Sequence, residues 1–441
     1  MRVAVLCSLD SQPVEAAVRR VLADCGVEVR FHDLTHERFA PCQGCFECWL
    51  VHPGTCKAKD HANEVMRDIV ASDAVIWLVR PRFGAWDPVA KAALDKTIGV
   101  VSPFFTTVGG ETHHRKRYGR YPKWAVLALS HPDDTEAERR RFRTLVARNV
   151  LNMRGYPPFV AFADDLAPEE FATMTEQALR HISAEQPEVD GPHIDPLPPL
   201  GDAVGPVTGD RRAVLWVGSA KRPGTSTSEA LGTALVRRLE ARGWDCRTLH
   251  AAKVTKFGRV GSPELVDAAR AASVLVVASP VYIDCLPALV LKGLGDVVDG
   301  VRNGDAPAVL PIVQCGFPEA THTRLAVELV ACGAVQSGMP WAGHLALGGG
   351  PSIGGSEIDS GRRFRRLQAV LDRVADALVA GDPVPPDLTS ELYAPVVHPT
   401  VYRWFGNIGI LAGSVRQGSF RELWQQPFAH PEDRDTERVS R

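Results

Sequence analysis

The sequence predicts an α/β protein that contains two successive doubly wound parallel sheets. Short apolar, β-branched segments alternate with segments of helical periodicity from Val3 to Ile182. A proline-rich stretch between Ala184 and Asp210 interrupts this alternation, which then restarts and continues to Val379. Repeated strand–helix units of this length favour a parallel sheet that is covered by helices on both faces. The interruption therefore indicates two domains of the same class.

The first domain, residues 1–185, is expected to have five strands, most of which are followed by a helical segment. The expected strands are Val3–Leu6, Val27–Phe31, Ala74–Val79, Trp124–Leu129 and Phe159–Phe162. The expected helices are Val14–Leu22, Ala62–Val70, Pro88–Ile98, Glu136–Leu151 and Glu169–Ile182.

A proline-rich linker, residues 186–210, is expected to lead to a second domain, residues 211–380. Its expected strands are Ala213–Val217, Cys246–Leu249, Ser273–Ala278 and Ala308–Val313. Its expected helices are Glu229–Arg242, Glu264–Ala271, Ala288–Val298, Ala320–Ala331 and Arg362–Val379. A second proline cluster then opens a C-terminal extension, residues 381–441.

Matching segments in the two halves indicate an internal repeat. Ala74–Pro81 and Val274–Pro280 are both apolar strands that end in proline, and a second proline follows each of them seven residues later. The helix that comes next carries a lysine and, four residues on, an aspartate: Lys91 with Asp95, and Lys292 with Asp296. Two halves built from such units are best explained by duplication.

Composition excludes several classes of protein. The formal net charge of −2 gives no indication of a nucleic-acid partner. No run approaches the roughly 20 apolar residues that cross a bilayer, and the first residues do not form a signal peptide. We therefore expect a cytoplasmic protein without a membrane partner. Of the ten cysteines, four lie in one loop, a pattern of metal or redox chemistry and not of a disulfide scaffold.

The stretch from Val214 to Ser228 reads as a strand, a turn of small residues and the start of a helix. Backbone N–H groups and the helix dipole make such a turn a site for phosphate. The loop matches neither the P-loop nor the dinucleotide fingerprint, and it suits a phosphate monoester. The alternative is a plain turn with a capping serine. The candidate phosphate-binding residues are Gly218, Ser219, Lys221, Thr225, Ser226, Thr227 and Ser228.

With these residues in view, the second half resembles the flavodoxin-like NAD(P)H-dependent FMN reductase family, which includes iron–sulfur flavoprotein relatives. The matching segments are Gly218–Ser228, Ser279–Tyr282, Leu286–Pro287, Cys315–Ala320 and Leu345–Gly350. The first half resembles another branch of the same superfamily, through the segments Cys42–Cys56, Pro81–Asp95 and Ser102–Pro122.

The resemblance implies two tandem flavodoxin-like domains, each a five-stranded parallel sheet, with FMN at the carboxyl ends of the second domain's strands. It implies an FMN-dependent NAD(P)H oxidoreductase in which the flavin performs the chemistry, so that no side chain is expected to be catalytic. The expected partners are a small-molecule electron acceptor and further copies in a homo-oligomer. The residues expected around the flavin ring are Pro280, Val281, Tyr282, Ile283, Asp284, Cys315, Gly316 and Phe317. Tyr282 either packs on the ring or is a half-buried residue at a strand end.

The first half departs from the family at its own phosphate turn, Cys7–Pro13. The turn has no glycine, and Asp10 would face a phosphate dianion at short range, which costs affinity. We interpret it as a degraded phosphate loop and expect the first domain to lack a flavin of its own.

Four cysteines form a compact loop with the spacing C-x2-C-x2-C-x7-C: Cys42, Cys45, Cys48 and Cys56. Four thiolates at this spacing are able to hold a [4Fe–4S] cluster or a zinc ion. The interpretation that we favour is a reduced loop packed around Phe46 and Trp49, and a redox-active disulfide is the third alternative.

A cationic stretch, Glu111–Tyr118, is interpreted as a long loop of the first domain. It would clamp an acidic substrate or the phosphate of NADPH, enter a partner subunit's flavin site, or simply face water. Two other functions stay open for the whole chain: a non-enzymatic electron carrier or redox sensor, and a cofactor-free interaction protein. No sequence motif supports hydrolysis.

Overall fold

The computed structural model of the chain describes residues 1–191, 205–257, 261–301, 306–355, 357–395 and 397–429. The chain divides into two compact units. Unit 1 consists of Met1–Ala40, Cys45–Leu197 and Arg403–Arg441, and unit 2 of Pro41–Gly44 and Pro198–Tyr402. Most of the expected linker, residues 192–204, lies outside the described ranges, as do the last twelve residues of the expected extension. The domain boundaries at 185, 211 and 380 stay predictions.

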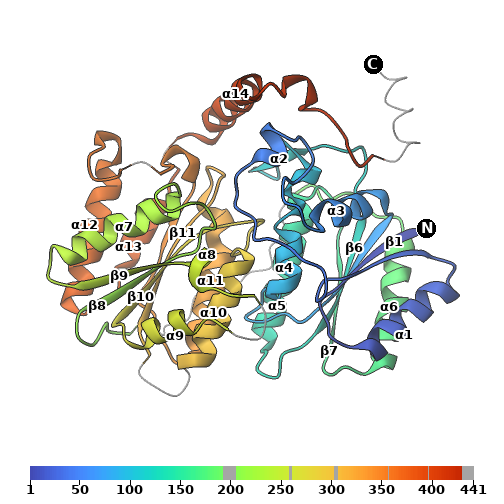
Figure 1. Cartoon of the computed structure of the whole chain (residues 1–441), viewed down its shortest axis with the longest axis horizontal. Coiled ribbons are helices and arrows are strands. Elements are labelled where there is room, and N and C mark those ends of the chain that lie inside the picture. Colours follow the sequence, from blue (N-terminus) through green and yellow to red (C-terminus); the bar gives the residue numbers. More distant parts are fainter. Residues whose placement is uncertain (192–204, 258–260, 302–305, 356, 396, 430–441) are drawn as a thin grey trace. The chain divides into compact units, whose positions relative to one another are not determined.

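Unit 1 contains a five-stranded parallel sheet with the order β2-β1-β3-β6-β7 (Figure 1). The strands are β1 (Arg2–Cys7), β2 (Glu28–Asp33), β3 (Ala74–Val79), β6 (Lys123–Leu129) and β7 (Phe159–Ala163). The helices of the sheet are α1 (Gln12–Asp24), α3 (Ala62–Ala71), α4 (Pro88–Leu94), α5 (Glu136–Asn152) and α6 (Pro168–Ser183), and α2 (Glu47–Leu50) lies in the cysteine loop. All five expected strands are present, with ends shifted by one or two residues.

The apolar patterns explain how this sheet is buried. Every residue of the central strand β3 is buried, because helices cover both of its faces. Alternate residues of the strands, such as Val3 and Val5, form one core with the apolar faces of α1 and α6. The expected helix Pro88–Ile98 ends early, at Leu94, and a 3-10 turn, Thr97–Val100, follows it.

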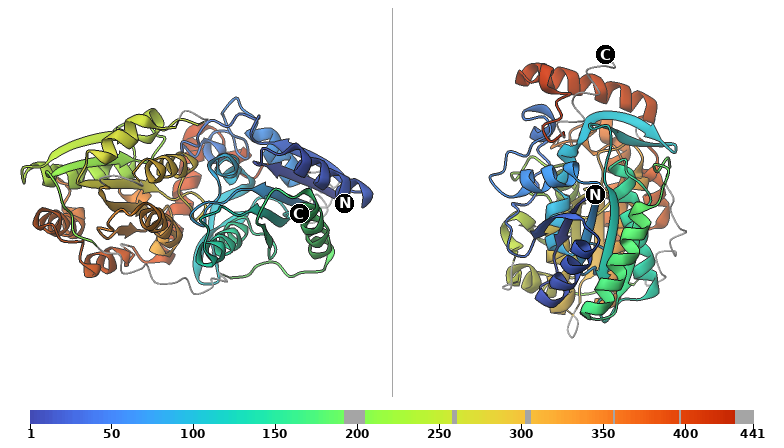
Figure 2. Two further views of the ribbon diagram at one scale, coloured as in Figure 1. Left: turned by 90° about the horizontal axis from the view of Figure 1, so that it is seen from below. Right: turned by 90° about the vertical axis from the view of Figure 1, so that its right-hand side faces the viewer.

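The cationic stretch of unit 1 is a strand and not a loop. β5 (Glu111–Lys116) pairs antiparallel with β4 (Val101–Val108) in a two-stranded hairpin, so the expectation of an irregular loop was wrong. Along β5, Thr112 and His113 are buried one after the other, Arg115 is exposed and the other residues are partly buried, so the strand is half-buried. From Arg403 onward, helix α14 (Pro399–Gln417) lies beside this hairpin (Figure 2). No expected element corresponded to α14.

Unit 2 repeats the architecture, with a parallel sheet of order β12-β11-β10-β8-β9. The strands are β8 (Arg212–Val217), β9 (Asp245–His250), β10 (Val274–Pro280), β11 (Ala308–Gln314) and β12 (Leu345–Leu347). The helices are α7 (Thr227–Glu240), α8 (Ala251–Val254), α9 (Pro263–Arg270), α10 (Ala288–Val301), α11 (Arg324–Ser337), α12 (Arg365–Ala380) and α13 (Pro386–Tyr393). α7 and α12 pack on one face of the sheet and form the main core with it.

Numbered from its own first strand, each sheet has the order 2-1-3-4-5, which is the flavodoxin order. The chain therefore contains tandem flavodoxin-like domains, and the predicted fold class is confirmed. The helices after the two third strands also match. Lys91 in α4 pairs with Asp95, the residue that ends the helix, and Lys292 pairs with Asp296 in α10 at 2.5 Å. None of the helices in the described ranges is long and apolar enough to cross a membrane.

A buried histidine links two layers of unit 1. His32, in β2, has its Nδ1 2.9 Å from a carboxylate oxygen of Glu37 and its Nε2 3.0 Å from one of Asp68, in α3. Burial alone would lower the pKa of His32. The hydrogen bonds with Asp68 and Glu37 outweigh burial and raise the pKa from 6.5 to about 9.

The raised pKa predicts a pH dependence of stability. Because the folded chain holds this proton more tightly than the unfolded chain, the stabilisation is complete below pH 6.5 and is lost as the pH rises through about 9. The loss amounts to roughly 3 kcal/mol. Urea unfolding of unit 1 between pH 6 and 9.5 measures it. The variant His32→Gln should remove this slope, whereas His36→Gln, at an exposed pair with Asp33, should keep it. Equal slopes in both variants would contradict the assignment.

Candidate functional site

The candidate site of unit 2 lies at the carboxyl edge of its sheet. In a parallel sheet all strands end at the same edge, and the loops after β8, β10, β11 and β12 therefore meet there. The predicted phosphate loop follows β8, and the predicted ring-binding segments follow β10 and β11. The structure thus gathers at one edge the segments that sequence analysis selected separately.

The loop after β8 ends in a capped helix N-terminus. Ser226 is the N-cap of α7, and its Oγ accepts the N–H of Glu229 at 3.1 Å. Its own hydroxyl hydrogen therefore stays available for a further acceptor. Among the described residues, neither the Thr227 N–H nor the Ser228 N–H has a protein acceptor. Three donors thus converge at the positive end of the α7 dipole.

Other bonds hold this loop in shape. The Lys221 N–H donates to Ser219 Oγ at 3.3 Å, and the Thr225 hydroxyl donates to the Arg222 carbonyl at 2.6 Å. Glu229 accepts the Gly224 N–H at 2.6 Å with one carboxylate oxygen, and its other oxygen lies 2.9 Å from His250 Nε2. The acidic side chain nearest the loop is therefore already engaged with the protein.

The start of the loop requires glycine for steric reasons. The Gly218 N–H donates to the Ala278 carbonyl at 2.7 Å, which draws the backbone against the neighbouring strand β10. A Cβ at Gly218 would lie 2.6 Å from a methyl carbon of Val290 and 3.0 Å from Ser279 Oγ. Any larger residue would push the loop away from the sheet.

The segment after β10 forms a tight turn. Tyr282 and Cys285 exchange backbone hydrogen bonds of 2.8 and 3.2 Å, and the two residues between them, Ile283 and Asp284, have φ angles of +55° and +54°. Two consecutive positive φ values define a type I′ turn. Tyr282 lies against Gly44, where an added Cβ would be 2.5 Å from the phenolic oxygen.

A buried aspartate–histidine pair holds this turn to the next loop. Asp284 Oδ1 lies 2.9 Å from Nδ1 of His322, and both side chains are only 2 % exposed. The His322 ring contacts the ring of Phe317, with centroids 4.7 Å apart. The sequence did not predict His322 as a site residue, because only the fold brings it close to Asp284.

Cys315 and Gly316 begin the loop after β11. Burial raises the pKa of the Cys315 thiol, which donates to the carbonyls of Phe317 and Glu319. A buried, neutral thiol of this kind stabilises the loop and is a poor nucleophile. Gly316 is exposed, and an added Cβ there would meet nothing within 4 Å, so this side of the loop is open.

The segment after β12 closes the site over the phosphate loop. The Thr227 hydroxyl donates to the Gly350 carbonyl at 3.1 Å, and the Gly350 N–H donates to the Cys315 carbonyl at 2.9 Å. Gln314, the last residue of β11, donates from Nε2 to Ser228 Oγ at 3.4 Å. Sequence analysis connected Gly350 to the family but did not select Gln314.

Tyr402 is a further residue that sequence analysis missed. Its hydroxyl donates to the Gly316 carbonyl at 2.7 Å, and its ring passes 3.7 Å from where a Cβ of Gly349 would be. Burial, followed by the nearby Cys315 and Glu319, raises the pKa of the Tyr402 phenol, which therefore acts as a neutral donor.

Unit 1 has a different turn at the equivalent place. Only four residues, Ser8–Ser11, separate β1 from α1, compared with nine, Gly218–Ser226, between β8 and α7. Ser8 donates its hydroxyl to Asp87 at 2.6 Å. Asp87 caps α4, and burial raises the pKa of its carboxyl group. The carboxyl group of Asp87 thus lies next to this turn.

The cysteine loop is divided between the units. Cys42 belongs to unit 2 and the other three to unit 1, where Cys45, Cys48 and Cys56 do not gather within 4.8 Å of one another among the described residues. All ten cysteines are described, and none forms a disulfide. Phe46 stacks on Trp49 at 5.2 Å, and Lys96 donates to Cys56 Sγ at 3.6 Å. The iron–sulfur alternative has no support from this arrangement.

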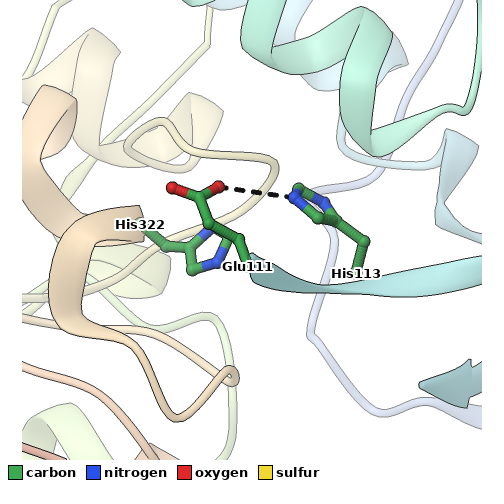
Figure 3. A group of neighbouring side chains, drawn as sticks. All are labelled: Glu111, His113 and His322. Atoms are coloured by element: carbon green, nitrogen blue, oxygen red, sulfur yellow. Dashed lines mark ion pairs between the residues drawn. The ribbon is translucent and has the colours of Figure 1, made fainter. Parts of the chain in front are cut away.

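The hairpin of unit 1 carries a buried polar cluster. The carboxylate of Glu111 lies 2.5 Å from an Arg148 nitrogen. It also lies 3.4 Å from Nε2 of His113 (Figure 3). The Nδ1 of His113 lies 3.1 Å from the Asn152 amide oxygen. Glu111 and His113, which were expected to face water or a substrate, are thus part of the fold of unit 1.

Comparisons with known proteins give matches among solved structures alone. No protein-family model matches the chain, and no curated protein matches it. An NAD(P)H:quinone oxidoreductase from Methanothermobacter marburgensis is similar, with 16% identity over 41% of this chain and 97% of its own, at a TM-score of 0.32. An FMN-dependent NADH-azoreductase from Bacillus anthracis has 10% identity over 38% of this chain and 100% of its own, at a TM-score of 0.30. The fold assignment itself rests on the strand order of the two sheets.

The packing of Gly350 predicts the effect of a single methyl group. In the variant Gly350→Ala, the new Cβ would lie 1.8 Å from Gln314 Oε1, so Gln314 must move and the loops after β11 and β12 must separate. We expect a loss of roughly 1–3 kcal/mol in the free energy of unfolding of unit 2, as for other overpacked sites. Gly316→Ala is the matched control, because its methyl group enters open space. Urea unfolding in the absence of added cofactor compares the two, and equal stabilities would contradict this packing.

Proposed function

We propose that the chain is an FMN-dependent NAD(P)H oxidoreductase whose flavin binds at the carboxyl edge of the unit 2 sheet. The observation that carries this proposal is the set of donors at the start of α7. A flavodoxin-type sheet, a nine-residue loop and a capped helix N-terminus together provide a place for a phosphate monoester at the switch between β8 and β10.

The phosphate end of FMN fits the donors that this loop offers. The N–H groups of Thr227 and Ser228 and the hydroxyl of Ser226 lie together at the start of α7 and would serve one acceptor. Lys221 and Arg222 supply positive charge on the same loop. Hydrogen bonds to a dianion contribute about 1.5–3 kcal/mol each, so three of them are sufficient to hold a phosphate. Glu229 does not oppose the phosphate strongly, because His250 and Gly224 engage its carboxylate.

We place the flavin ring of FMN at the two loops that follow β10 and β11. One side of the loop after β11 is open at Gly316, where an added Cβ would meet nothing within 4 Å, and the turn Tyr282–Cys285 follows β10 at the same edge. The pair Asp284–His322 holds the two segments at a fixed separation. A planar ring system between them would meet a preorganised surface.

When bound, FMN would accept a hydride from a nicotinamide and pass electrons to a small-molecule acceptor. The residues of the chain would bind and orient it. Ser226, Thr227 and Ser228 would fix the phosphate, and the Tyr282–Cys285 turn would fix the ring. His322 and Asp284 lie almost wholly out of the solvent, and their contact would hold this turn in place. The homo-oligomer stays a prediction.

We also propose that unit 2, and not unit 1, binds the flavin. The short turn Ser8–Ser11 lacks the length to surround a phosphate, and Asp87 places a buried carboxyl group next to it. Asp87 is unfavourable for a bound dianion in both of its forms. The ionised carboxylate repels the dianion, and the neutral acid still holds the hydroxyl group of Ser8.

The two N-cap serines give a matched test of the phosphate site. Ser226 caps α7, and Ser11 caps α1 through the same kind of bond, to the N–H of Val14. Each serine-to-alanine change should cost about 1 kcal/mol of helix stability. Ser226→Ala alone also removes a donor to the phosphate, and we expect FMN to bind roughly 10- to 100-fold more weakly. Quenching of FMN fluorescence during titration measures the dissociation constant.

The variant Ser226→Thr keeps the hydroxyl group and should keep most of the affinity. If Ser11→Ala weakened FMN binding as much as Ser226→Ala, the flavin would belong to unit 1. If neither change mattered, the phosphate would lie elsewhere.

Rapid mixing with NADH or NADPH under argon tests the reaction class. We expect the flavin absorbance near 450 nm of the loaded protein to bleach with one of the two nucleotides, since a two-electron donor is then oxidised by the bound flavin. A protein that binds FMN but is not bleached by either nucleotide would be an electron carrier. A protein that binds no FMN would be the cofactor-free interaction protein.

A further inference from the structure

Helix α14 presents an apolar face to the outside. The exposed fractions of Trp404, Phe405 and Val415 are 62 %, 61 % and 62 %, and Ile408 is 43 % exposed. At 100° per residue these four side chains fall within about 100° of the helix circumference, so they form one stripe. A surface helix ordinarily turns such a stripe towards the core.

The polar and small residues of α14 face the protein instead. Asn407 Oδ1 accepts the N–H of Phe105 at 2.7 Å, and its amide donates to the Phe105 carbonyl at 3.4 Å. Arg403 donates to Thr112 Oγ1 at 3.1 Å. Gly406 packs so closely on the Phe105 ring that an added Cβ would lie 2.4 Å from it. These contacts, all within unit 1, fix the rotation of the helix about its axis.

Two further exposed aromatic side chains follow the end of the helix. Phe420 is 43 % exposed and Trp424 is 51 % exposed, and their rings are in contact with centroids 5.5 Å apart. Ser419 anchors this segment by donating to the Leu50 carbonyl at 2.5 Å. Several large apolar side chains gathered on one well-anchored segment indicate a surface that binds something.

The positive charges on this segment indicate an anionic partner. From Pro399 to Trp424 the sequence contains three arginines and one acidic residue, Glu422, so the segment carries a net positive charge. Arg416 and Arg421 are exposed, and they lie at the end of the apolar stripe. Tryptophan and phenylalanine on one face, with arginines at its border, are the composition of helices that lie in the headgroup region of anionic bilayers.

We propose that α14 and the segment up to Trp424 dock unit 1 on the surface of an anionic lipid bilayer. The helix would lie in the plane of the interface with Trp404, Phe405 and Ile408 inserted, and with Arg416 and Arg421 at the lipid phosphates. Lying on a membrane is distinct from crossing it, and no described helix is able to cross one. This inference is independent of the flavin.

Other occupants fit this surface less well. Between Trp404 and Val415 the stripe is about 17 Å long and roughly 10 Å wide, far below the ~800 Å² per partner of a stable protein interface. The C-terminal residues 430–441 read HPEDRDTERVSR and offer almost no apolar side chain to cover the stripe.

Sedimentation with vesicles tests the proposal on the full chain. We expect the protein to sediment with vesicles of phosphatidylcholine and phosphatidylglycerol, and much less with phosphatidylcholine alone. The double variant Trp404→Ser/Phe405→Ser should bind roughly 10- to 100-fold more weakly, since it loses two inserted side chains. Arg416→Gln/Arg421→Gln should bind about tenfold more weakly to the anionic vesicles. Val335→Ser, at a 67 % exposed valine of unit 2, is the control and should bind like the parent protein.

Thermal unfolding and light scattering accompany these measurements. The double variant should melt like the parent, because neither side chain is buried. Absence of sedimentation, equal sedimentation with both kinds of vesicle, or an effect of Val335→Ser as large as that of the double variant would each overturn the proposal. A parent dimer that the double variant converts to a monomer, without vesicle binding, would assign the surface to a second copy and would overturn it as well.

Discussion

The candidate site depends on one side chain at the end of a central strand. Gln314 closes β11, and its backbone carbonyl accepts the N–H of Val281 at 2.9 Å, which fixes the turn after β10. Its amide nitrogen reaches Ser228 in α7, and its amide oxygen fills the space that a side chain at Gly350 would need. One residue thus sets the positions of three loops. Since it is buried, each of these polar contacts is costly to leave unmade.

The strands and the loops after them could be predicted from the sequence, because their signals are local. β3 and β10 are largely apolar runs with a proline at the end or two residues beyond it, and such runs have few alternatives to a buried parallel strand. The carboxyl-edge rule then brings together loops that lie far apart in the sequence. The strand order came from the family resemblance, and the structure has the same order in both sheets.

The elements that could not be predicted depend on tertiary contacts. The buried residues of β5 are the polar Thr112 and His113, which a pattern of apolar residues does not detect. α14 has its apolar residues on the outside, so a search for core-facing periodicity finds nothing there. Gln314 and His322 belong to the site through contacts with Ser228 and Asp284, each more than thirty positions away in the chain. No local sequence signal specifies such pairs.

The turn after the third strand shows how the two units have diverged. In unit 1 its central residues are Phe83 and Gly84, and glycine is required because an added Cβ would lie 2.9 Å from a backbone oxygen. Unit 2 keeps the same backbone with Ile283 and Asp284, although a β-branched residue at positive φ is unfavourable by about 1–3 kcal/mol. Such strain persists only where surrounding contacts determine the conformation. The Tyr282–Cys285 hydrogen bonds and the buried Asp284–His322 pair provide those contacts. Unit 2 therefore has a fixed carboxyl group at the edge where we place the flavin ring. The turn that carries this group is one that its residues would not adopt without the surrounding contacts.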